Sequence, residues 1–183
     1  MTNTATSNLI DLLLADHAEA EDVLQRMRTA PAADRAEVFC ELTEALVRHE
    51  VAEEVVVYPR VRQIPGGDAI ADAKIAEQQE AESTLVRLDD LDPASVEFLD
   101  EVTAFAGDVL RHAASEETDL FPLLESAASP EELEQLGERY TSAKEAAPSH
   151  PHPHAPDTPP GNVIAGPVLA LVDRIRDAAS ARR

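Results

Sequence analysis

Two stretches of the chain decide the fold: RHEVAEEVVVYP at residues 48–59 and RHAASEETDLFP at residues 111–122. Both follow one pattern, Arg-His, three residues, Glu-Glu, three residues, then an aromatic residue and Pro. Amphipathic helices do not ordinarily repeat so many positions in register by chance. The sequence therefore indicates an internal repeat.

A weaker repeat links DHAEAE at residues 16–21 with EQQEAE at residues 77–82, each followed by Leu, Arg and an apolar residue at matching spacing. Apolar residues at steps of three and four predict long helices over residues 9–27, 33–63, 68–88 and 94–127. Short connectors favour antiparallel neighbours. The sequence thus predicts an all-α fold, an up-down-up-down four-helix bundle with additional C-terminal helices.

Local signals refine this prediction. Ser7 is placed to cap the first helix, and Val55 falls on the same apolar stripe as Val38 and Leu42 in the second. Ser129 followed by Pro130 is typical of a new helix start. We expect four segments: the bundle at 6–128, an accessory helix at 129–147, a Pro/His-rich linker at 148–162 and an amphipathic helix at 163–181.

The strong repeat carries metal-binding chemistry. His49 and Glu53 are four residues apart, as are His112 and Glu116, so each pair lies on one helix face. Imidazole suits iron, zinc and copper, and carboxylates can bridge two cations. A surface Glu-His contact is the alternative for either pair alone, and the repetition favours a metal site. His17 joins the site only because it lies at a matching height in the bundle.

At these residues the sequence resembles the hemerythrin-like family of HHE cation-binding domains. That family has a His on the first helix, His-x-x-x-Glu on the second, a His on the third and His-x-x-x-Glu before an aromatic-Pro pair on the fourth. The resemblance implies a non-haem di-iron centre in a four-helix bundle. His17, His49 and His112 would be its nitrogen ligands, with Glu53 and Glu116 as bridging carboxylates.

The third helix departs from the family pattern, because Gln78 stands where a histidine is expected. Glu82 or Glu21 could coordinate in its place, Gln78 could bind weakly through its amide oxygen, or a histidine could come from the Pro/His-rich segment. We favour a carboxylate, since Glu82 shares a helix face with Gln78 and Glu21 is its partner in the weaker repeat. A solvated surface acid is an equally good interpretation of Glu82.

Exchanging imidazole for carboxylate favours ferric iron and weakens reversible oxygen carriage. We therefore expect a protein that handles oxygen, peroxide or nitric oxide, or senses iron or oxygen, with a weak peroxide-decomposing activity left open. The alternative is a metal-dependent or metal-free interaction module that binds a protein partner through its C-terminal helix. Tyr58 could be a ligand or a redox group, but Phe121 at the matching position favours packing.

The net charge of −21 argues against nucleic acid and anionic membrane surfaces as partners. The sequence shows no transmembrane stretch and no signal peptide, and Cys40 is its single cysteine. We expect a cytoplasmic protein.

Overall fold

The computed structural model describes residues 8–147, and this part of the chain is helical with no strand. The four long helices are α1 (Leu9–Thr29), α2 (Arg35–Ala52), α4 (Gly67–Asp89) and α5 (Val96–Ser115). A fifth, α7 (Pro130–Ala146), follows the bundle. The predicted Pro/His-rich linker and terminal amphipathic helix lie outside the described residues, and the four segment boundaries stay predictions.

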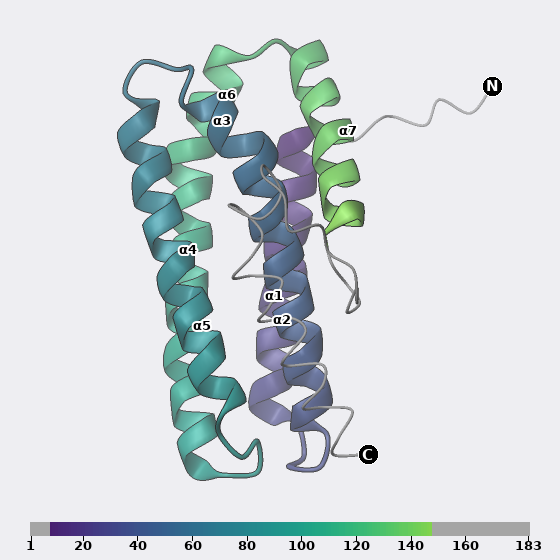
Figure 1. Ribbon diagram of the computed structural model, residues 1–183. Coiled ribbons are helices and arrows are strands. Elements are labelled where there is room, and N and C mark those ends of the chain that lie inside the picture. The colour runs from purple at the N-terminus through teal and green to yellow at the C-terminus, as the bar shows by residue number, and fades with distance from the viewer. Residues whose placement is uncertain (1–7, 148–183) are drawn as a thin grey trace, which may run out of the picture.

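The helices run alternately up and down, as the sequence indicates (Figure 1). Helices α1 and α2 form one hairpin, α4 and α5 form the other, and α7 returns alongside α1 and α2. This arrangement confirms the all-α bundle with an additional helix at its C-terminal end. No helix within residues 8–147 combines the length and the apolar character needed to cross a membrane.

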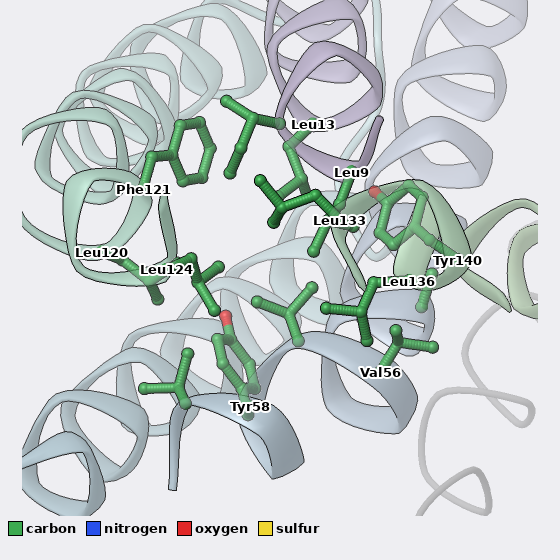
Figure 2. Packing of buried hydrophobic residues seen from close by; sticks show 14 of the residues in the cluster. Leu9, Leu13, Val56, Tyr58, Leu120, Phe121, Leu124, Leu133, Leu136 and Tyr140 are labelled. Atoms are coloured by element: carbon green, nitrogen blue, oxygen red, sulfur yellow. The ribbon is translucent and has the colours of Figure 1, made fainter. Parts of the chain in front are cut away.

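Apolar side chains form two large clusters at different heights of the bundle. One includes Leu24, Leu42, Leu88, Phe98 and Phe105. The other gathers residues from the opposite end together with side chains of α7, as Figure 2 shows: Leu9, Leu13, Val56, Tyr58, Leu120, Phe121, Leu124, Leu133, Leu136 and Tyr140. Burying such side chains supplies most of the stabilisation of a helical bundle. The layer between the two clusters holds the polar residues of the repeats.

Two π-helical turns interrupt helices that the sequence predicts to be unbroken. They are η1 (Glu53–Val57) and η2 (Glu116–Leu120), followed by α3 (Tyr58–Val61) and α6 (Phe121–Ala127). A proline ring clashes with the carbonyl group four residues before it, so Pro59 and Pro122 disfavour ordinary α-helical turns at these places. Each wider turn begins at the glutamate of a His-x-x-x-Glu pair.

The extra residue in the π turn shifts the register of the helix. The prediction that Val55 lies on the apolar stripe is therefore wrong: its side chain is 45% exposed, and Val56 and Val57 are buried instead. The predicted cap at Ser7 is also replaced, because Asn8 accepts the hydrogen bond from the Asp11 backbone N–H. Asn caps helices as well as Ser does and immediately precedes the first apolar residue.

The start of α4 depends on a close backbone approach at Gly67. A Cβ atom there would collide with the carbonyl oxygen of Val61, whereas one on Gly107 in α5 would meet nothing closer than Arg111 Nη1 at 3.6 Å. We expect Gly67→Ala to lower the free energy of unfolding by about 1–3 kcal/mol. Gly107→Ala should raise it by about 0.5–1 kcal/mol, because a helical alanine loses less backbone entropy. Urea unfolding followed by circular dichroism checks both, and equal stabilities would contradict the close approach.

Candidate metal centre

Four side chains converge in the middle layer of the bundle. His17 of α1, His49 of α2, Glu53 of η1 and Glu116 of η2 each place a potential ligand atom within 4.8 Å of those of the others. The side chains of Glu53 and Glu116 are 0% exposed. Nε2 of His49 lies 3.4 Å from Oε2 of Glu53, and Nε2 of His17 lies 3.3 Å from Oε2 of Glu116. The structure thus brings together four residues of the predicted site.

His112 of α5 extends the group on its other side. Its Nε2 atom lies 3.4 Å from Oε1 of Glu116, while His17 faces Oε2 of the same carboxylate. Glu116 therefore stands between two histidines, one on each oxygen.

The outer nitrogens of His17 and His112 are each held by a carboxylate. Nδ1 of His17 lies 2.9 Å from Oε1 of Glu117, and Nδ1 of His112 lies 2.7 Å from Oε2 of Glu77. Because carboxylates only accept hydrogen bonds, both rings carry a proton on Nδ1. In a neutral ring this leaves the Nε2 lone pair directed at the centre, as in metal sites where a carboxylate orients the ligating histidine.

His49 is oriented by a network that reaches α7. Its Nδ1 atom donates to Oη of Tyr140 at 2.8 Å, and Tyr140 donates in turn to Oδ2 of Asp16 at 2.6 Å. Nζ of Lys144 donates to the other oxygen of Asp16 at 2.6 Å. Burial raises the pKa of Asp16, but hydrogen bonds from His49, Lys144 and Tyr140 outweigh it and lower the pKa to about 2. Asp16 is therefore a permanent anion behind this network.

Gln78 and Tyr58 bind the two buried carboxylates from the side of α4 and α3. Nε2 of Gln78 donates to Oε2 of Glu53 and to Oη of Tyr58, both at 2.7 Å. Oη of Tyr58 lies 3.0 Å from Glu53 and 3.2 Å from Glu116. Tyr58 therefore does more than pack, because its hydroxyl group contacts both buried carboxylates. Phe121 at the matching repeat position stacks on the ring of His17 instead.

The carboxylates predicted to replace the missing histidine lie elsewhere. Glu21 is exposed, and Glu82 is half-buried with its charge acting on Glu50 and Glu54. Neither belongs to the convergent group, and their role as ligands stays a prediction. Glu50 is only 7% exposed and its Oε2 atom has no hydrogen-bond partner. Sequence reasoning missed Glu50 because the second copy of the repeat has Ala113 at that position.

Buried atoms without partners gather at this centre. Within residues 8–147, the buried side-chain atoms that lack a hydrogen-bond partner are His17 Nε2, Glu50 Oε2, Glu53 Oε1, Gln78 Oε1, His112 Nε2 and Glu116 Oε2. Buried polar atoms are nearly always paired, and a group of unpaired acceptors beside two carboxylates is an environment that stabilises a bound cation. The residues present therefore fit a metal centre.

The charges of the centre support the same conclusion. Burial raises the pKa of Glu53 well above its ordinary value, and the charge of Glu116 raises it further. Burial acts in the same direction on Glu116, but contacts with His17, His112 and His49 outweigh it and lower its pKa. Two carboxyl groups this close repel each other when both are ionised. They are stable together only with compensating positive charge, supplied by protons or by a metal ion.

Fold and site together define a helical-bundle protein with a carboxylate- and histidine-lined cation site. Residues 8–124 match the hemerythrin HHE cation-binding domain, and the chain belongs to that family. It is 28% identical over 174 residues to an uncharacterized hemerythrin-like protein of Schizosaccharomyces pombe, covering 93% of this chain and 86% of the relative.

A second relative, a protein of Nostoc named as a DNA nickase, is 30% identical over 139 residues. The alignment covers 75% of this chain but only 39% of that protein. No solved structure matches the chain significantly. The family assignment therefore rests on the sequence matches, and the arrangement of the site rests on the structure of this chain.

We expect the hydroxyl group of Tyr140 to strengthen metal binding, because it fixes the orientation of the His49 ring. Tyr140→Phe removes only the hydroxyl oxygen that accepts from His49 and donates to Asp16, and partners of this kind contribute about 10- to 100-fold in metal affinity. Competition against a chelator measures the change. Ser142→Ala, which removes an exposed hydroxyl from the same helix, is the control. Equal affinities of the two variants would show that α7 does not influence the centre.

Proposed function

We propose that the chain is a non-haem di-iron protein that acts on peroxide rather than carrying oxygen reversibly. The observation that carries this proposal is the convergence of unpaired acceptor atoms between two fully buried carboxylates. Imidazole together with carboxylate is a donor set that iron accepts. Nitric oxide and dioxygen are the alternative small ligands for the same centre.

The side chains divide into two candidate sets around the shared carboxylates. His17 and His49 would hold one iron, since both face the group formed with Glu53 and Glu116. His112 lies beside the other oxygen of Glu116 and would hold the second. Support for Glu50 as a further ligand comes from its burial, its unpaired oxygen and its electrostatic interaction with Glu116.

The choice of peroxide rests on the balance of donors. Counting Glu50, three carboxylates accompany three imidazoles, and the third helix contributes the neutral amide of Gln78. Anionic ligands stabilise the ferric state, which disfavours reversible release of oxygen. Bound iron would supply redox chemistry toward peroxide. The Tyr58 hydroxyl, placed against both buried carboxylates, can hold or exchange a proton beside them.

A pair of acid-to-amide substitutions tests the ligand set. Glu50→Gln keeps the size of the side chain but removes the charge, and we expect iron content to fall from about two to about one per chain. Glu82→Gln removes a nearby charge outside the convergent group and should leave the content unchanged. Elemental analysis of protein loaded anaerobically with ferrous iron measures both. Loss of iron in the Glu82 variant alone would contradict our assignment and support Glu82 as the ligand.

Spectroscopy tests the proposed activity. Hydrogen peroxide added to the iron-loaded protein should change its visible absorption and be consumed at a rate that Glu116→Gln reduces at least tenfold, because that variant loses the shared charge. Oxygen added to the ferrous protein should oxidise it without a spectrum that reverses under vacuum. A fully reversible oxygen spectrum, with no consumption of peroxide, would overturn the proposal.

A further inference from the structure

A cavity of about 780 Å³ borders the centre and extends along the bundle axis between α1, α2, α4 and α5. At one end it is lined by His17, His49, Gln78 and His112. It continues past Ala81 and Thr84 to Phe105 in the apolar layer beyond.

Small side chains in the layer next to the centre create this space. Ala20 follows His17 by three residues, Ala45 precedes His49 by four, and Ala81 follows Gln78 by three. These spacings place all three alanines one turn from the centre on the same side. Interiors are normally filled to crystal-like density, and larger residues at these positions would close the space.

The volume is far larger than a diatomic gas or hydrogen peroxide needs. A water molecule, which is of similar size, occupies about 30 Å³ of liquid. Cavities of about 300–1,000 Å³ that are mostly apolar are typical of sites for organic molecules. The space beside this centre is therefore suited to a ligand with a hydrocarbon part.

The polar groups of the cavity restrict the chemistry of that ligand. At the inner end, Gln78 is 3% exposed, and its Oε1 atom is an acceptor with no hydrogen-bond partner. Amide oxygen is a weak ligand for iron beside carboxylates and imidazoles, so an O–H donor fits it better. At the outer edge, the exposed side chains of Glu21 and Glu80 repel an anionic group, and the charge of Asp108 is paired with that of Arg111.

We propose that the cavity binds an uncharged, unbranched aliphatic hydroperoxide, and equally the corresponding alcohol. The terminal O–H would donate to Oε1 of Gln78, and the alkyl chain would lie between Ala20, Ala45 and Ala81. This inference names the class of peroxide for the centre and so rests on the proposed function. It concerns binding alone, and the alcohol serves as an unreactive probe of the same shape.

Calorimetric titration of the full chain with 1-octanol tests the inference, in both the iron-loaded and the metal-free forms. We expect saturable binding that Ala81→Leu weakens at least tenfold, because the added atoms fill the cavity. Ala73→Leu, on the exposed side of the same helix, is the matched control and should bind as the unsubstituted chain does. Octanoate should bind at least tenfold more weakly than octanol. Circular dichroism checks folding, and Ala20→Leu on the facing wall is the second cavity-filling variant.

The outcomes separate this inference from the proposed function. Absence of octanol binding, or equal binding by the Ala81 and Ala73 variants, overturns the ligand assignment even if two irons are bound. Octanoate binding as tightly as octanol overturns the choice of an uncharged ligand. Octanol binding that depends on Ala81 in a chain that takes up no iron would support the cavity and contradict the di-iron function.

Discussion

Two carboxylates buried face to face in the middle of the bundle are the constraint on which the structure depends. Glu53 and Glu116 are 0% exposed, and burying one ionised carboxylate without compensation is costly. The chain provides hydrogen bonds from Tyr58 and Gln78 but leaves one oxygen of each carboxylate without a partner. The remaining compensation comes from protons or from a bound cation, and a bound cation would link metal uptake to the stability of the fold.

The surrounding elements position the side chains of the centre in different ways. The π turns start at the two glutamates themselves. Carboxylates outside the centre fix the rings of His17 and His112, and Tyr140 of α7 does the same for His49. Arg60 of α3 joins this framework by pairing with Glu132 at the start of α7. Helix α7, beyond the matched family region, is thus connected to the centre through the network around His49.

The sequence predicts the parts of this structure that follow from periodicity and repetition. Helix spacing predicts the bundle, and the His-x-x-x-Glu pairs predict His49, Glu53, His112 and Glu116, whereas His17 is predicted only from its matching height. Features that depend on a single residue could not be predicted from the sequence. The π turn that exposes Val55 depends on how the chain relieves a proline clash, and Glu50 lacks a counterpart in the repeat. The link from Tyr140 to His49 spans 91 residues, and no local pattern encodes such a contact.

X-ray absorption spectroscopy at the iron edge of the loaded full chain tests the central claim most directly. We expect scattering from imidazole rings together with an iron neighbour at about 3.5 Å, the separation of metals that share ligands in two-metal sites. A single oxygen shell with no imidazole and no iron neighbour would place the metal outside the buried layer and contradict the account.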